Sequence, residues 1–149
     1  MSWQAYIDTS LVGTGAVDRA AIFSATGDSV WATSPAFNVS PTEMQAVVAA
    51  YKDPGNKEGV KKVQSEGLHI AGERFVVLKA DDRSVYGKKV SLHLWEGATA
   101  NTLRQGREGV VIVKTTQAIL VTHYPESVQP GVAANTVEQL GDYLIKVGY

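Results

Sequence analysis

The strongest structural signal in this chain is a pair of β-branched runs, Gly109-Val-Val-Ile-Val-Lys114 and Gln117-Ala-Ile-Leu-Val-Thr-His123. Valine, isoleucine and threonine favour the pleated, half-buried surface of a strand. Only Thr115 and Thr116 separate the two runs, and so short a connection joins neighbouring antiparallel strands. The pair predicts a β-hairpin, and the rest of the fold is built outward from it.

Apolar residues recur at helical spacing at both ends of the chain. From about Pro130, residues at three- and four-residue intervals between Ala133 and Val147 predict an amphipathic helix. The same spacing between Trp3 and Leu11 predicts a short helix near the N-terminus. A third helix is expected after Ser40-Pro41-Thr-Glu43, because this stretch supplies a capping serine, a proline at the first helical position and a reciprocal glutamate.

Shorter strand-like runs fill the middle of the chain. Residues 20–24 and 29–33 flank a glycine-containing turn, and residues 68–70, 74–80 and 83–86 follow a polar stretch, 56–66, that predicts a loop. Helices at the two ends with strands and one helix between them favour an α+β fold with an antiparallel sheet over repeated βαβ units.

Length and charge narrow the function classes. A chain of 149 residues fits one domain, residues 1–149. Its formal net charge of −1 argues against a nucleic-acid partner, which would require many phosphate contacts. The absence of cysteine excludes disulfides and thiolate chemistry. Without a signal peptide or a long apolar run we expect a cytoplasmic protein.

No pattern of catalytic residues is found in the sequence. His69, His93 and His123 are scattered, without the spacing of a metal site or an acid–base pair. Gly13-Thr-Gly15 lacks the third glycine of a dinucleotide-binding loop. We therefore expect a protein that is not an enzyme and needs neither cofactor nor metal.

Seven segments follow one another along the chain: Ser2-Trp-Gln-Ala-Tyr6, Gly27-Asp-Ser-Val-Trp-Ala32, Gly67-Leu-His-Ile-Ala-Gly72, Ala80-Asp-Asp-Arg-Ser-Val-Tyr-Gly87, Glu108-Gly-Val-Val-Ile-Val113, His123-Tyr-Pro125 and Val137-Glu-Gln-Leu-Gly-Asp-Tyr-Leu144. In this order they resemble segments of the profilin family, most of all its fungal members. The resemblance implies a central antiparallel sheet with the N- and C-terminal helices on one face and shorter helices on the other. It also implies a monomeric protein of the actin cytoskeleton that binds monomeric actin and proline-rich segments of formin-like proteins, and so regulates actin polymerisation.

The resemblance implies a proline-rich-peptide site between the terminal helices, on Trp3, Tyr6, Trp31, Tyr143 and Tyr149. A polyproline II ligand has no internal hydrogen bonds, so flat rings pack between its prolines while indole N–H and phenol O–H groups meet its carbonyls. Taken without the resemblance, Trp3, Tyr6 and Tyr143 are better explained as packing residues. Many animal profilins have histidine where this chain has Tyr143, so ligand preference is expected to differ.

Two further sites follow from the same resemblance. The actin-binding residues are expected on the later strands and the start of the last helix: Val77, Lys79, Tyr86, Lys88, Lys114, Val128, Gly131, Asn135 and Gln139. A phosphoinositide patch, for phosphatidylinositol 4,5-bisphosphate at the membrane surface, is expected from five basic residues: Arg83, Lys88, Lys89, Arg104 and Arg107. The alternative for each lysine taken singly is a solvated charge on a strand or loop.

The chain departs from the fungal pattern at about residues 90–106, which form an unusual insertion. One hypothesis is a longer hairpin with its tip near Gly97 and Trp95 on a loop beside the actin-binding face. A competing hypothesis is a retained intron, because Val90-Ser91, Ala100-Asn101 and Gln105 can be encoded by donor, branch-point and acceptor consensus sequences. The alternative function is a proline-rich-peptide-binding module whose actin binding is weak or absent because of the insertion.

Overall fold

The computed structural model describes residues 3–35, 37–53, 67–81, 83–92 and 103–149. The helical segments are α1 (Trp3–Ala5), η1 (Tyr6–Leu11), η2 (Val12–Thr14), α2 (Pro41–Lys52) and α4 (Pro130–Lys146). The strands are β1 (Arg19–Ser24), β2 (Val30–Thr33), β3 (Leu68–Ile70), β4 (Glu73–Ala80), β5 (Ser84–Leu92), β6 (Leu103–Lys114) and β7 (Ala118–Tyr124).

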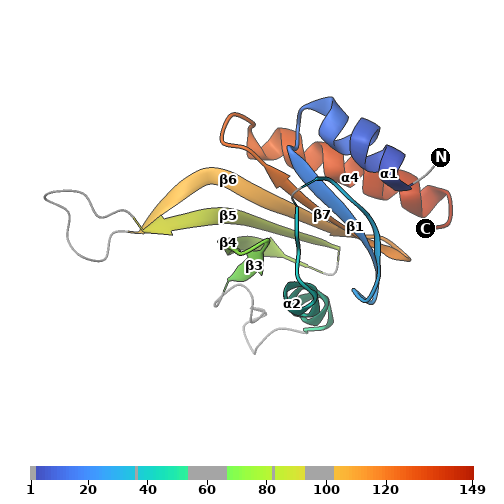
Figure 1. Cartoon of the computed structure of the whole chain (residues 1–149), viewed down its shortest axis with the longest axis horizontal. Coiled ribbons are helices and arrows are strands. Elements are labelled where there is room, and N and C mark those ends of the chain that lie inside the picture. Colours follow the sequence, from blue (N-terminus) through green and yellow to red (C-terminus); the bar gives the residue numbers. More distant parts are fainter. Residues whose placement is uncertain (1–2, 36, 54–66, 82, 93–102) are drawn as a thin grey trace, which may run out of the picture.

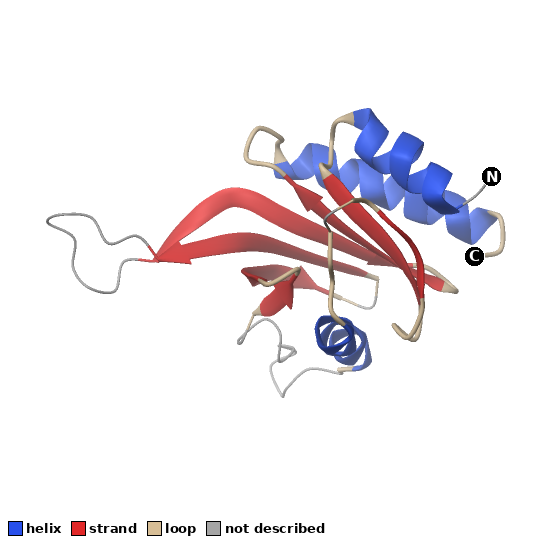
Figure 2. Cartoon of the chain, viewed as in Figure 1, coloured by secondary structure: helices blue, strands red, loops and turns tan. Residues whose placement is uncertain are grey.

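The seven strands form one sheet in the order β2-β1-β7-β6-β5-β4-β3, with every neighbouring pair antiparallel. The N-terminal helical segment and α4 lie side by side on one face, and α2 lies on the other (Figures 1 and 2). The expected α+β fold is confirmed. Within the described residues α2 is the one helix on its face, and the predicted loop at 56–66 lies outside them.

The predicted hairpin of β6 and β7 forms the centre of the sheet, and both of its faces are covered. Val111 and Val113 belong to the core under the terminal helices, whereas Val110 and Ile112 belong to the core under α2. Successive side chains of a strand point to opposite faces. The continuous β-branched run therefore supplies two cores at once, and this explains why it lacks the polar alternation of a half-exposed strand.

The predicted start of α2 is confirmed in detail. The Ser40 side chain accepts from the Glu43 amide at 3.1 Å, and the Ser40 amide donates to Glu43 Oε1 at 2.8 Å. The same carboxylate also accepts from the amides of Ala71 and Gly72, at 3.0 and 2.9 Å, in the turn between β3 and β4. One glutamate thus caps a helix and holds the outer hairpin against it.

β5 and β6 extend farther than the sequence predicted. The strand expected at 83–86 continues to Leu92, which pairs with Leu103, after an irregularity between Lys88 and Val90. The pairing supports the longer hairpin, and its expected tip near Gly97, with Trp95, lies outside the described residues.

His69 and His123 both lie on strands, as expected, but His123 has a carboxylate partner that the sequence did not reveal. His123 on β7 is buried, 2.6 Å from an Asp18 oxygen and 3.2 Å from an Arg19 nitrogen, and His69 is exposed on β3. His93 lies outside the described residues. Among the residues that the structure describes, no cluster of three or more acidic, histidine or cysteine side chains could hold a metal, and no helix is long and apolar enough to cross a bilayer.

Candidate functional site

Five aromatic residues from four segments of the chain form one continuous cluster. Trp3 of α1 lies at the centre, with ring centroids 4.7 Å from Trp31 on β2, 5.6 Å from Tyr6 and 5.0 Å from Tyr149. Tyr6 in turn lies 6.1 Å from Tyr143 on α4. These distances are typical of interacting rings. The structure thus brings together all five residues that the resemblance implied, and we call them the aromatic cluster.

The C-terminal Tyr149 is held in place by the turn between β6 and β7. Its main-chain oxygen accepts hydrogen bonds from the Thr115 hydroxyl at 2.8 Å and from the Gln117 amide at 2.5 Å. Its own amide donates to the Leu144 carbonyl at 2.8 Å. These three bonds fix the backbone, so the ring stands edge-on to Trp3 while 42% of the residue stays exposed.

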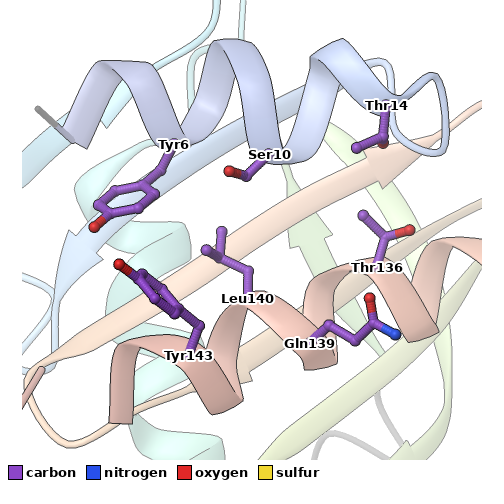
Figure 3. A pocket seen from close by; sticks show the side chains of 7 residues that line it. All are labelled: Tyr6, Ser10, Thr14, Thr136, Gln139, Leu140 and Tyr143. Atoms are coloured by element: carbon purple, nitrogen blue, oxygen red, sulfur yellow. The ribbon is translucent and has the colours of Figure 1, made fainter. Parts of the chain in front are cut away.

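Tyr6 and Tyr143 face one another across the line between the two helices. Figure 3 shows their hydroxyl groups pointing toward each other, Tyr6 from η1 and Tyr143 from α4. Tyr6 is buried and Tyr143 is 47% exposed. Burial, followed by the hydrogen bond with Tyr143, raises the pKa of Tyr6. The two phenols therefore interact directly across the line between the helices.

A pocket of about 370 Å³ lies between the N-terminal helical segment and α4, and Tyr6 and Tyr143 form one end of it (Figure 3). We call it the interhelical pocket. Its lining residues are Tyr6, Ser10, Thr14, Thr136, Gln139, Leu140 and Tyr143. Sequence reasoning did not assign Ser10, Thr14, Thr136 or Leu140 to a site. The spacing of Tyr6, Ser10 and Thr14, four residues apart, was the signal that places them on one helical face.

A second, apolar pocket of about 180 Å³ lies where β4, β5 and β6 meet the start of α4. We call it the strand-side pocket. It brings together three residues that were predicted to bind actin, Tyr86, Lys88 and Gly131, and adds Leu78, which is 53% exposed. The ammonium group of Lys79 lies 5.0 Å from the centre of the Tyr86 ring, so this predicted residue adjoins the pocket.

Tyr86 is anchored to α4 by a polar network. Its hydroxyl donates to Glu138 Oε1 at 2.8 Å, and the Ser84 hydroxyl donates to the same oxygen. Arg83 completes the network through ion pairs of 3.0 Å with Glu138 and 2.7 Å with Asp142. Burial, and then the bond to Glu138, raises the pKa of Tyr86 to about 12. The network fixes the strand-side pocket against the last helix.

Val77 is the predicted actin-binding residue that lies buried in the core, away from the outer surface. Only 6% of it is exposed, and it packs in the core under α2 with Phe75 and Val85. Val77 points into the core on the same side of β4 as Phe75, and the next residue, Leu78, points to the outer surface. The pairing of β4 with β5 becomes irregular only after Val77.

The other predicted actin-binding residues are spread over the surface. Lys114 lies 5.7 Å from the Tyr51 ring centre, on the α2 side of the sheet. Val128 lines a separate hollow with Val132, and Asn135 is exposed on α4. Gln139 lines the interhelical pocket. Their roles in actin binding stay predictions.

The expected phosphoinositide patch is already partly neutralised. Arg83 is paired with Glu138 and Asp142, and Lys89 lies 3.1 and 3.0 Å from carboxylate oxygens of Glu73 and Glu108. The side chains of Arg104 and Arg107 lie outside the described residues. The structure gives no clustering of free positive charge among the described members of this set, and phosphoinositide binding stays a prediction.

The Profilin family model matches residues 1–149. The chain belongs to the profilin family. It is 46% identical to the profilin of Schizosaccharomyces pombe and 46% identical to that of Saccharomyces cerevisiae, in each case over 100% of both sequences. The crystal structure of the S. pombe profilin superposes with a TM-score of 0.81 at 44% identity, covering 99% of this chain and 100% of that one. The expected likeness to fungal profilins is confirmed.

Two more distant profilin structures share the fold and contain partners of their own. Mouse profilin IIa, in complex with a double repeat from the FH1 domain of mDia1, has a TM-score of 0.70 at 19% identity, and covers 100% of both chains. LokiProfilin2, in complex with rabbit actin, has a TM-score of 0.73 at 16% identity, and covers 99% of both chains. Profilins are actin-binding regulatory proteins and not enzymes, in agreement with the sequence prediction.

Proposed function

We propose that this profilin binds monomeric actin around the strand-side pocket and binds proline-rich segments of formin-like proteins at the aromatic cluster. Holding both ligands at once raises the effective concentration of actin at an assembly factor. The protein thereby regulates actin polymerisation. The relatives that carry the family name, and the actin and FH1 complexes of distant profilins, support this function.

The observation that carries the proposal is the convergence of the aromatic cluster. Trp3, Trp31 and Tyr149 come from segments far apart in the chain, yet their rings adjoin at 4.7 and 5.0 Å. Most of these rings keep exposed surface. A polyproline II helix offers flat proline faces and bare carbonyls, and such a set of exposed rings and polar tips is complementary to both.

The two surfaces lie on different sides of α4, so neither ligand has to displace the other. Tyr143 and Gln139 belong to the groove with η1, whereas Gly131 and Ala134 belong to the strand-side pocket. The strand-side pocket combines an apolar floor with the charged rim of Lys88 and Lys79. Such mixed surfaces suit contacts that form and dissolve repeatedly.

The function implies a monomer in the cytoplasm at the actin cytoskeleton. A phosphoinositide is a further expected ligand. Of the described residues in the predicted basic patch, Arg83 and Lys89 are paired with acidic side chains, whereas no acidic partner of Lys88 is found among the described residues. Sedimentation with vesicles containing phosphatidylinositol 4,5-bisphosphate tests it, and a Lys88→Glu variant that sediments equally well would count against this site.

The alternative function, a peptide-binding module with weak or absent actin binding, is favoured by one observation. The paired part of β5 and β6 runs on past Lys88 to Leu92 and Leu103, beside the strand-side pocket. Figure 1 shows these two strands projecting beyond the rest of the sheet. A projection at this place is positioned to hinder a large partner.

Parallel titrations separate the two functions. Binding of poly-L-proline is followed by tryptophan fluorescence, and binding of actin by the polymerisation rate of pyrene-labelled actin. Saturable proline binding with slowed assembly supports the two-ligand profilin. Proline binding alone supports the peptide module, and neither response would overturn both.

One matched pair of variants assigns the two surfaces. Lys88→Glu reverses a charge beside the strand-side pocket and is expected to weaken actin binding several-fold without affecting proline binding. Tyr143→Ala is expected to do the opposite, because Tyr143 faces the other side of α4. Loss of both activities in either single variant would contradict two separate surfaces.

A further inference from the structure

The interhelical pocket differs in chemistry from the aromatic cluster that it continues. Beyond the Tyr6 and Tyr143 hydroxyls most of the lining residues are polar. Leu140, which lies between the two helices, is the aliphatic residue of the lining (Figure 3). Ser10 and Thr14 come from the N-terminal segment, and Thr136 and Gln139 come from α4. Proline rings pack against aromatic rings, so they do not account for the hydroxyl and amide groups that line this part of the groove.

Two of these polar groups can only accept hydrogen bonds from a ligand. The Thr136 hydroxyl donates its hydrogen to the Val132 carbonyl at 3.0 Å, and the Thr14 hydroxyl donates to the Leu11 carbonyl at 2.6 Å. A threonine hydroxyl has a single hydrogen. What these side chains still offer to the pocket is therefore lone pairs, and Thr14 already uses one to accept from the Ala16 amide.

The other two polar groups have no partner among the described residues. Ser10 is half-buried and Gln139 is exposed, and neither side chain hydrogen-bonds within the described part of the chain. The Gln139 amide presents a carbonyl acceptor and two N–H donors, and the Ser10 hydroxyl presents both kinds. Across the pocket, the lone pairs that remain free on Thr136, Gln139 and Ser10 therefore outnumber the free N–H and O–H hydrogens of Gln139 and Ser10.

A proline tract cannot satisfy these acceptors, because proline has no backbone N–H. Its carbonyls suit the tyrosine hydroxyls and the indoles of the aromatic cluster. At the interhelical pocket a ligand that brings donors can pair with the acceptors that a proline tract would leave unpaired. The pocket is continuous with the cluster through Tyr6 and Tyr143, so the same peptide reaches both.

We propose that the interhelical pocket selects a donor-bearing, non-proline residue at one end of the bound proline tract, such as glutamine, with Gln139 and Ser10 as specificity-determining residues. This inference rests on the proposed proline-peptide function and specifies its ligand. The side-chain and backbone N–H groups of that residue meet the oxygens of Thr136, Gln139 and Ser10, and its methylenes cover Leu140.

The test compares three peptides of equal length. One has twelve prolines, the second has ten prolines followed by two glutamines, and the third has two glutamines followed by ten prolines. The two orders together cover both directions in which the tract can lie in the groove. One glutamine peptide is expected to bind about fivefold more tightly than the all-proline peptide, the effect of about one net hydrogen bond. Titration calorimetry or tryptophan fluorescence gives the three affinities.

Variants then locate the preference. The quantity compared is the affinity for the preferred glutamine peptide divided by the affinity for the all-proline peptide. In Gln139→Leu and in Ser10→Ala this ratio is expected to fall toward one. Gln45→Leu is the matched control, because Gln45 is exposed on α2 across the sheet and lines none of the pockets described above; it should keep the fivefold ratio. Circular dichroism checks that each variant is folded.

The outcomes distinguish this inference from the function on which it rests. If all three peptides bind the unaltered chain equally, or the all-proline peptide binds best, the inference is wrong and the proline-peptide function stands. If a preference exists but survives in Gln139→Leu and Ser10→Ala, the assigned residues are wrong. If none of the peptides binds, both the inference and the proposed function fail.

Discussion

Single side chains explain how the site works. Trp3 contacts Tyr6, Trp31 and Tyr149, so one residue links the N-terminal segment, the sheet and the C-terminus in the proposed peptide-binding surface. Tyr143 contributes differently. It contacts Tyr6 at the edge of the cluster and leaves 47% of its surface to solvent. We therefore expect the centre of the cluster to contribute to stability as well as to the proposed peptide binding, and its exposed edge to contribute to peptide binding alone.

Replacing Tyr143 tests this division. Tyr143→Ala is expected to weaken binding of a proline peptide about tenfold, because it removes a ring and a hydroxyl that face the ligand. The free energy of unfolding should change by only about 0.5 kcal/mol, since the residue is half-exposed. Peptide titration and urea unfolding measure the two effects.

The matched control is Ile145→Ala, which removes an apolar side chain of similar exposure, 43%, from the same helix. It lies outside the aromatic cluster and should leave peptide affinity unaltered. Equal losses of peptide affinity in both variants would point to a general perturbation of α4 and contradict the role given to Tyr143.

Ionisation of the Tyr86 phenol is expected to lower the stability of the folded chain at alkaline pH. Burial and the bond to Glu138 raise its pKa in the folded chain to about 12, from 10.0. A group whose folded pKa is raised contributes stability that is complete below the unfolded value and is lost as pH rises toward the folded one. The stability due to Tyr86 is therefore expected to fall between about pH 10 and 12.

Urea unfolding at pH 9 and pH 11 measures this loss. The unaltered chain should lose more stability between the two pH values than Tyr86→Phe, in which this phenol is absent. Burial also raises the pKa values of Tyr51 and Tyr124. Their ionisation at high pH lowers the stability of both proteins, so their contribution cancels in the comparison. An identical loss in the two proteins would show that Tyr86 ionises as easily folded as unfolded.

At the scale of elements, close packing of α4 on β6 depends on a residue without a side chain. A Cβ atom at Gly141 would lie 2.9 Å from Val113 Cγ1 and 3.3 Å from an Arg83 nitrogen. Gly141 is buried on the helix face that covers the sheet. The helix that carries Tyr143 thus depends on a glycine for its distance from the strands.

Gly141→Ala is expected to destabilise the chain by about 1–3 kcal/mol, because the cost of overpacking exceeds the gain of about 1 kcal/mol in helix propensity. Gly131→Ala is the control on the same helix, since its Cβ would meet nothing within 4 Å. That variant should be neutral or slightly stabilised in thermal or urea unfolding. A stabilised Gly141→Ala variant would mean that α4 moves away from β6 at little cost.

At the scale of the whole molecule, α4 separates the proposed peptide and actin surfaces, and the β5–β6 extension lies on the actin side alone. Replacing residues 90–106 by an Asn-Gly turn is expected to strengthen actin binding several-fold and to leave proline-peptide binding unaltered. Pyrene-actin assembly and peptide titration test this. Unaltered actin affinity in the shortened chain would show that the insertion does not hinder actin.

A separate measurement addresses the origin of the insertion. A mass spectrum of the native protein that contains residues 90–106 would exclude the retained-intron hypothesis, whereas transcripts that skip the segment would support it. Pairing from Val90 with Gln105 to Leu92 with Leu103 shows that both ends of the segment form regular strand.

The sequence by itself determined the local elements and the family. Side-chain periodicity identified β6, β7 and α4, and the Ser40 and Glu43 pair identified the start of α2, because helical and strand spacing and capping depend on neighbours a few residues away. The ordered motifs identified the profilin family, and with it the aromatic cluster.

Tertiary structure alone decided which residues of these elements share a surface. It buried the face of β4 that carries Val77 under α2 and exposed Leu78 on the other face, and it placed Ser10 opposite Gln139 in the interhelical pocket. Both outcomes depend on register and on the packing of elements distant in the sequence. Local periodicity carries no information on either, because each is set by contacts that form only when the whole sheet and its helices assemble.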